Sequence, residues 1–236
     1  MRYRSAAGRE TVQEPDMLRG VALEERSPLT EPRAYRGRIS IVTAWFCATN
    51  GRRVWCNSAI QMDAAMLLDF DPDIECFQSG VAELRWEEGG RSGAVRPAFF
   101  ARTRGGQRLA IVHPPTARTA VAEEQVVREA AKAAGWHIRP LQVPQGVLRS
   151  SLRCVAHFRA AEFAPDSDAR KALLKKFATP QPLQAGAAAS GLGLQATGHA
   201  WHLLWMGELT CDWTKPLLPT SLVWASSTKS ARQVDR

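Results

Sequence analysis

Three aspartates spaced two residues apart, Asp69, Asp71 and Asp73, are the first residues in the chain whose types and spacing could do chemistry. Alternating carboxylates of this kind begin a calcium-binding loop, which then needs a glycine for its sharp turn and a bidentate glutamate at its end. Ile74 and Gly80 occupy those two positions here. The spacing therefore does not predict a calcium site, and a turn that ends a helix is the expected role of this stretch.

Two histidines, His199 and His202, lie three residues apart on an expected helix, a spacing that can place two ligands on one metal ion. No third ligand lies nearby in the sequence, so packing or surface roles are favoured over a metal site. Serine chemistry is not indicated either, because Ser58 has no G-x-S-x-G motif around it.

Basic residues form the third set. The chain has 31 Lys and Arg against 23 Asp and Glu, a formal net charge of +8 that favours a polyanionic partner such as DNA. Side chains along two expected helices could contact phosphates, each contact adding about one unit to the salt dependence of binding. A solvated basic helix face is an equally good explanation. The candidate DNA-binding residues are Arg52, Arg53, Arg149, Arg153, Lys171, Lys175 and Lys176.

The cysteines and the distribution of apolar residues indicate in which cellular compartment the protein is expected. The five cysteines are odd in number, widely spread and without a C-x-x-C pair, so we expect reduced thiols and neither a disulfide framework nor a zinc site. The first sixteen residues, MRYRSAAGRETVQEPD, have no apolar core, so a secretory signal is not expected. Because no run of about eighteen apolar residues occurs, we expect a cytoplasmic protein.

The elements that would position these residues alternate between strands and helices. Asn50-Gly51 is a strong signal for a type I′ turn between strands over 38–48 and 52–56. Asn57 or Ser58 can cap a helix that runs to about residue 70, and Gly135 can end a second helix over 121–134. Further strands are expected over 74–77, 82–86, 95–102, 107–113 and 136–143, with a turn over 87–91. This order predicts an α/β core.

A second region begins near residue 145. Three short helices are expected there, over 147–159, 167–177 and 199–206, and a hairpin of strands over 207–211 and 222–225 follows. Helices followed by such a hairpin are typical of a winged helix. We therefore expect a flexible N-terminal arm over 1–37, an α/β domain over 38–144, a winged-helix domain over 145–225 and a polar tail over 226–236.

Several stretches in this order resemble a known family. Ser58-Ala59-Ile60-Gln61, the run LDFDPD over 68–73 and the run RPAFFAR over 96–102 resemble the TnsA-like endonuclease subunits of heteromeric transposases. Gly135-Trp136 and the later HLLWMGEL and KPL runs are similar to the C-terminal part of the actinobacterial branch. The resemblance covers roughly residues 38 to 225 and rests on the ordered series of stretches.

The resemblance implies a fold and a role. It implies a restriction-endonuclease-like core, PD-(D/E)XK in type, followed by a small winged-helix domain. Members of the family use Mg²⁺ to nick the 5′ ends of a mobile element, while a DDE-type transposase cuts and joins the 3′ ends. An ATP-dependent regulator acts with both. The partners implied for this chain are therefore transposon-end DNA, a DDE-type transposase and, as a further partner, that ATP-dependent regulator, in the cytoplasm of a bacterium.

The residues at the family's catalytic positions depart from its pattern. Gln61 stands where the helix supplies a glutamate, and Ala98 stands where the middle strand supplies an aspartate. Ile111 and His113 stand where the last strand supplies a carboxylate or glutamine and then a basic residue. Because Mg²⁺ prefers charged carboxylates and dehydrates reluctantly, we expect no Mg²⁺ cofactor and an inactive nuclease that serves as a scaffold or DNA clamp.

Two alternatives remain open at this point. An acid could have moved, with Asp63, Glu75 or Glu83 as the candidates, and the chain would then be an active nuclease. Alternatively, the chain could be a DNA-binding regulator that keeps the nuclease fold without a transposase partner.

Overall fold

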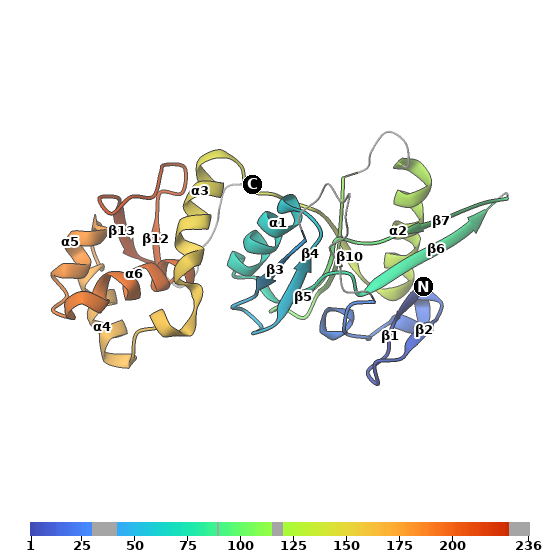
Figure 1. Cartoon of the computed structure of the whole chain (residues 1–236), viewed down its shortest axis with the longest axis horizontal. Helices are drawn as coiled ribbons and strands as arrows, with labels where there is room; N and C mark the ends of the chain where they lie inside the picture. Colours follow the sequence, from blue (N-terminus) through green and yellow to red (C-terminus); the bar gives the residue numbers. More distant parts are fainter. Residues whose placement is uncertain (30–41, 89, 115–119, 227–236) are drawn as a thin grey trace. The chain divides into compact units, whose positions relative to one another are not determined.

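The computed structural model describes residues 1–29, 42–88, 90–114 and 120–226 and has a mixed α/β fold with several sheets (Figure 1). The chain divides into two compact units. The first comprises Met1–Asp69 and Asp73–Val143, and the second comprises Phe70–Pro72 and Pro144–Arg236. Among the described residues, none of the helices has the length and apolar character needed to cross a membrane.

The main sheet of the first unit has the strand order β10-β9-β8-β5. β5 (Ile74–Gln78), β8 (Phe99–Thr103) and β9 (Arg108–Val112) form an antiparallel meander, and β10 (His137–Pro140) joins β9 in parallel. Parallel neighbours need a crossover connection, and a helix before β10 supplies it here.

Helices α1 (Ala59–Phe70) and α2 (Ala120–Ala134) lie on either side of this sheet (Figure 1). Phe100 and Ala110 share a buried cluster with α2, and the Phe100 ring packs edge-on against Trp136 at 5.1 Å. Gly135, with a φ of +72°, follows α2 in the left-handed conformation that the expected C-cap requires. Phe77 and Phe99 make an edge-to-face ring contact in the same sheet.

A second sheet of the first unit has the order β2-β1-β6-β7, from β1 (Arg2–Arg4), β2 (Glu10–Val12), β6 (Ala82–Glu88) and β7 (Arg91–Val95). The expectation of one strand over 95–102 was wrong. Val95 ends β7 and pairs with Leu84 of β6, whereas β8 starts only at Phe99. Pro97 lies in the gap, where its missing N–H makes a continuous ladder unfavourable.

The expectation of an N-terminal arm over 1–37 does not hold for residues 1–29. These residues form β1, β2 and the short 3₁₀ helices η1 (Pro15–Leu18) and η2 (Leu23–Glu25). Tyr3, Leu18 and Leu23 are buried in the same cluster as α2. The polar composition misled the expectation because a few apolar side chains are enough to anchor the segment. Residues 30–37 lie outside the described residues.

The hairpin of β3 (Thr43–Phe46) and β4 (Arg53–Cys56) was predicted, but the predicted type of its turn was wrong. Cys47 N–H donates to Arg52 O at 2.9 Å, and Gly51 N–H donates to Cys47 O at 3.0 Å. Only Gly51 has a positive φ, +65°, so Asn50 does not adopt the conformation of a type I′ turn. The loop is therefore longer than the two residues expected.

The second unit contains helices and a small sheet of order β11-β13-β12. The expected second helix and final hairpin are present, and Asp166 caps its helix by accepting from Asp168 N–H and Ala169 N–H. The first expected helix is shorter, because residues 156–159 are 3₁₀. The elements are α3 (Gly146–Val155), η3 (Ala156–Arg159), η4 (Ala161–Phe163), α4 (Ser167–Lys176), β11 (Gln181–Pro182), α5 (Leu183–Ala188), η5 (Gly193–Gln195), α6 (Ala196–Trp205), β12 (Leu209–Cys211) and β13 (Leu222–Ala225).

Helix α6 is central to the second unit. Every residue from Ala200 to Trp205 is buried. The rings of Phe158 and Trp201 stack at 5.5 Å, and Phe70, which belongs to this unit, packs against Trp205 at 5.4 Å. The expected polar tail begins at Ser226, and residues 227–236 lie outside the described residues.

Candidate functional site

The N-terminus of α1 holds Gln61 in a capping box. Ser58 Oγ accepts from the Gln61 backbone N–H at 3.1 Å, and Gln61 Oε1 accepts from the Asn57 N–H at 2.7 Å. A serine followed three residues later by glutamine is the sequence pattern of a capping box. Here the glutamine oxygen accepts from Asn57, the residue before the N-cap, instead of from Ser58 itself. Gln61 is 5% exposed, so its amide is fixed inside the protein.

Hydrogen bonds join three of the four family-equivalent positions. Gln61 Nε2 donates to the carbonyl of Ala98 at 3.1 Å, and the Ala98 N–H donates to the carbonyl of Ile111 at 2.7 Å. Ala98 and Ile111 are buried. His113 follows β9 with an exposed side chain, although partial desolvation of its ring lowers its pKa. The first turn of α1, the residue before β8 and the strand β9 are therefore adjacent at this point.

This meeting point does not fit Mg²⁺. The one acceptor oxygen of the Gln61 side chain is already used by a backbone N–H. Ala98 and Ile111 have no side-chain ligand atoms, and the lowered pKa keeps His113 neutral at pH 7. Mg²⁺ needs near-octahedral oxygen ligands, with carboxylates to hold it. The amide therefore braces the helix against the sheet.

The acids considered as relocated ligands have other surroundings. Glu75 is exposed and pairs with Arg102 at 3.0 Å, and Asp63 is buried in α1. Within the described ranges, one group of three potential metal ligands has its donor atoms close together, and it includes none of Asp63, Glu75, Glu83 or Gln61. The described residues thus offer no replacement carboxylate set at the Gln61 position.

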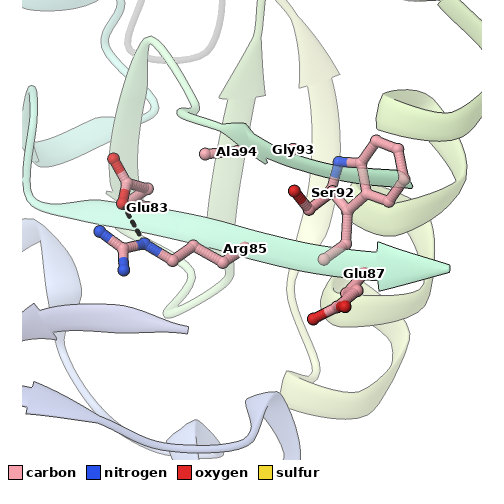
Figure 2. Close-up of a pocket in the computed structure, with 7 residues that line it drawn as sticks. Glu83, Arg85, Glu87, Ser92, Gly93 and Ala94 are labelled. Atoms are coloured by element: carbon pink, nitrogen blue, oxygen red, sulfur yellow. Dashed lines mark hydrogen bonds and ion pairs between the residues drawn. The ribbon is translucent and has the colours of Figure 1, made fainter. Parts of the chain in front are cut away.

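Glu83 lies in an open pocket of about 700 Å³ on the β6–β7 hairpin (Figure 2). Its carboxylate pairs with Arg85 at 2.7 Å, with Arg2 at 3.4 Å and with Arg96. Burial alone would raise the pKa of Glu83, but hydrogen bonds from Arg85 and Arg96 outweigh burial and lower it. The Glu83 carboxylate is therefore an ion-paired structural group and a poor candidate for a general base.

A glycine is required in the wall of this pocket. A Cβ atom at Gly93 would lie 2.7 Å from the ring of Trp86, its partner across the hairpin. The indole therefore covers the Gly93 backbone. The pocket is lined by Glu83, Arg85, Trp86, Glu87, Ser92, Gly93 and Ala94.

Asp69, the first of the three aspartates, is a buried structural acid. Its carboxylate accepts from Trp45 Nε1 at 2.9 Å, from Cys47 Sγ at 3.0 Å and from Ala48 N–H at 3.0 Å. Thr49 donates from its N–H at 2.9 Å and from its hydroxyl at 2.6 Å. These bonds fasten the β3–β4 loop to the end of α1, a role that the sequence spacing did not reveal.

Two of the candidate DNA-binding residues lie in the first unit. Arg52 is exposed, and its guanidinium donates to the carbonyl of Glu25 at 2.9 Å. Arg53 lies over the ring of Trp55, 5.6 Å from its centroid, on the outer face of the β3–β4 hairpin. Both side chains are held by protein contacts and remain accessible to solvent.

The other five lie on two helices of the second unit. Arg149 and Arg153 are one helical turn apart on α3, and Arg153 is exposed. On α4, Lys171 and Lys175 are exposed, Lys176 is half-buried, and Lys171 lies 3.5 Å from Asp168. Each helix thus presents basic side chains, which suits either phosphate contacts or a solvated face.

The two histidines on α6 have packing roles. His199 Nδ1 lies 2.9 Å from the carbonyl of Phe163, and His202 Nδ1 lies 2.8 Å from the carbonyl of Phe158. Because a carbonyl can only accept, each Nδ1 carries the proton. Burial lowers the pKa of His202, so it stays neutral near pH 7. The pair tethers the 156–163 segment to α6.

No model of a known protein family matches this sequence, and no curated protein matches it significantly.

Proposed function

We propose that this chain is a catalytically inactive TnsA-like subunit that acts in DNA transposition as a DNA-binding scaffold. The first unit supports this reading through its order of elements. Helix α1 precedes the meander β5-β8-β9, and α2 then leads to β10 beside β9. This is the order expected of a restriction-endonuclease-like core, with the β6–β7 hairpin inserted between β5 and β8.

The second unit supports the winged-helix part of the proposal. The short strand β11 lies between α4 and α5, and it pairs with β13, the last strand of the hairpin that follows α6. Helix α6 is largely buried and has neither lysine nor arginine. Phosphate contacts would therefore come from α3 and α4. The hairpin loop, whose Leu218 is 53% exposed, suits a protein partner, either the DDE-type transposase or the ATP-dependent regulator.

One observation carries the proposal most directly. Gln61 Nε2 donates to the Ala98 carbonyl, so the helix and strand of the family's catalytic pair are adjacent. At the same time, the Gln61 oxygen is used by the helix cap. On this proposal, the chain keeps the frame of a nuclease and has a neutral amide where an active relative would bind its cation.

The DNA-binding part is tested by the salt dependence of binding to duplex DNA. We expect Lys171→Ala with Lys175→Ala to reduce the slope of log affinity against log salt by about two. The matched control, Arg128→Ala with Lys132→Ala, removes two exposed charges one turn apart on α2 and should reduce the slope by less. Equal slopes for both double variants would contradict phosphate contacts from α4.

The scaffold role is tested with the partner. The chain should co-purify with a DDE-type transposase encoded beside it and should not nick end-containing DNA with Mg²⁺ or Mn²⁺. Nicking that survives Gln61→Ala would instead indicate an active nuclease with relocated ligands. Salt-sensitive DNA binding without any transposase partner would favour a regulator that keeps the nuclease fold.

A further inference from the structure

Two glutamates and a cysteine converge at the far end of β8 from Gln61. Glu24 and Glu25 belong to η2, which packs against β5 and β8, and Cys76 belongs to β5. One donor atom from each residue lies within 4.8 Å of the others. Glu24 and Cys76 are buried, and Glu25 is exposed. The group therefore has a buried base and one side open to solvent.

Glu24 is the unusual member of the group. Its side chain is 1% exposed, and Oε1 is buried without a hydrogen-bond partner. The nearest cationic atoms are Arg102 Nη1 at 3.4 Å and Arg108 Nε at 3.8 Å, and Arg108 Nε also lacks a hydrogen-bond partner. A buried carboxylate oxygen left without a hydrogen bond is costly and calls for a partner.

Arg102 forms an ion pair with this oxygen but no hydrogen bond. Its Nη1 lies 2.8 Å from Glu25, and its Nε lies 3.0 Å from Glu75. The guanidinium is thus directed at the outer two carboxylates. The ion pairs of the inner carboxylate, Glu24, are longer, at 3.4 Å to Arg102 and 3.8 Å to Arg108.

The local charge favours a further cation. The carboxylates of Glu24, Glu25 and Glu75 pair with the guanidiniums of Arg102 and Arg108. Three negative and two positive groups leave a net charge of −1, and ionisation of Cys76 would bring the net charge to −2. Burial raises the pKa of Glu24. Burial, opposed by the charge of Arg102 and aided by the neighbouring carboxylates, raises the pKa of Cys76 to about 11. A divalent cation would neutralise the group and deprotonate a coordinating thiol.

We propose that Glu24, Glu25 and Cys76 form a binding site for a divalent cation of the Zn²⁺ type. The donor set decides the class, because Mg²⁺ and Ca²⁺ take oxygen ligands, whereas Zn²⁺ accepts thiolate and carboxylate together. Solvent on the Glu25 side can supply a fourth ligand. The site is separate from the proposed nuclease frame and does not depend on the proposed function. Occupied, it would tie the N-terminal segment to the main sheet.

The test is metal titration of the full chain after treatment with a chelator, in a Cys154→Ser background that removes the exposed thiol. We expect one equivalent of Zn²⁺ to bind and the melting temperature to rise with free Zn²⁺. Co²⁺ should give a thiolate-to-metal charge-transfer band. Affinity should rise with pH, because binding releases the Cys76 proton.

Two variants and a matched control separate this site from adventitious binding. Cys76→Ser should abolish the charge-transfer band, and Glu24→Gln should weaken Zn²⁺ binding by at least about tenfold. Cys56→Ser removes another buried thiol, whose Sγ lies 3.7 Å from the Val54 carbonyl, and should bind like the parent. Far-ultraviolet circular dichroism checks that each variant is folded.

The proposal is overturned if the folded parent binds no Zn²⁺ at micromolar concentration. It is equally overturned if Cys76→Ser and Cys56→Ser give the same Co²⁺ spectrum and Zn²⁺ affinity. If Cys76→Ser does not fold, the parent spectrum and the Glu24→Gln affinity decide the question.

Discussion

Helix α1 and the short helix η2 both bury polar side chains in the first unit, but with different surroundings. On α1, the Gln61 amide and the Asp69 carboxylate have hydrogen-bond partners for their polar atoms. On η2, the Glu24 carboxylate keeps a buried oxygen that no hydrogen bond reaches. A buried polar group that is fully paired stabilises architecture, whereas one that is left unpaired indicates a missing partner.

The difference shows where chemistry should be sought in this chain. The position that the resemblance marks as catalytic is occupied by the neutral amide of Gln61. The amide oxygen accepts from a backbone N–H at the start of α1, and the amide nitrogen donates to the Ala98 carbonyl. The buried oxygen without a hydrogen bond belongs to Glu24, which lies in a segment that the sequence indicated to be an arm. The three predictions below test this contrast between α1 and η2.

The largest effect is expected at Asp69. Asp69→Ala should lower the free energy of unfolding by about 3 kcal/mol or more, because it removes the acceptor of the buried Trp45 and Cys47 donors and of the half-buried Thr49 hydroxyl. Asp69→Asn keeps one acceptor oxygen and should cost less. Chemical denaturation measures both, and a loss below about 1 kcal/mol for the alanine variant would show that these bonds are dispensable.

An intermediate effect is expected when the glutamate that the resemblance implies is introduced at position 61. Gln61→Glu should cost about 1–3 kcal/mol at pH 7, because a carboxylate cannot donate to the Ala98 carbonyl. The cost should shrink at acidic pH, where the protonated carboxyl can donate. The exposed Gln107→Glu is the matched control and should change stability little. An unchanged denaturation midpoint for Gln61→Glu would show that the brace has no energetic role.

The smallest effect is expected at Glu24 in metal-free protein. Burial raises the pKa of Glu24 above 4.5, so the folded state holds its proton more tightly than the unfolded state does. Stability contributed by this group is therefore present below about pH 4.5 and is lost as pH rises through the folded-state pKa. Glu24→Gln should remove that loss and change stability at pH 7 by no more than about 1 kcal/mol.

Denaturation across pH 4 to 8 with chelator present measures this prediction. The free energies of unfolding of the parent and of Glu24→Gln should diverge as the pH rises, and the variant should be as stable as the parent or more stable. A large loss of stability in Glu24→Gln would instead mean that Arg102 and Arg108 already satisfy the carboxylate.

Local signals in the sequence predicted several elements well. Asn57 or Ser58 was expected to cap the helix, and Ser58 does accept a hydrogen bond at the start of α1. Gly135 was expected to end α2, and it follows that helix with a positive φ. Helix α4 begins at Ser167, as expected, and Asp166 caps it. These features involve neighbours a few residues apart, so their hydrogen bonds are encoded locally. The N-terminal segment was missed because its burial depends on Leu18 and Leu23 meeting a core formed by distant residues.

The sequence by itself determined the alternation of helices and strands, the basic charge and the absence of carboxylates at Gln61, Ala98 and Ile111. Only the tertiary structure decided that both polar atoms of the Gln61 amide form hydrogen bonds to backbone groups. It also decided that Glu24 and Cys76, 52 positions apart in the sequence, lie close together and are buried. The reason is that side-chain pairing across a sheet depends on which strands become neighbours, and that choice is made by the packing of the whole unit.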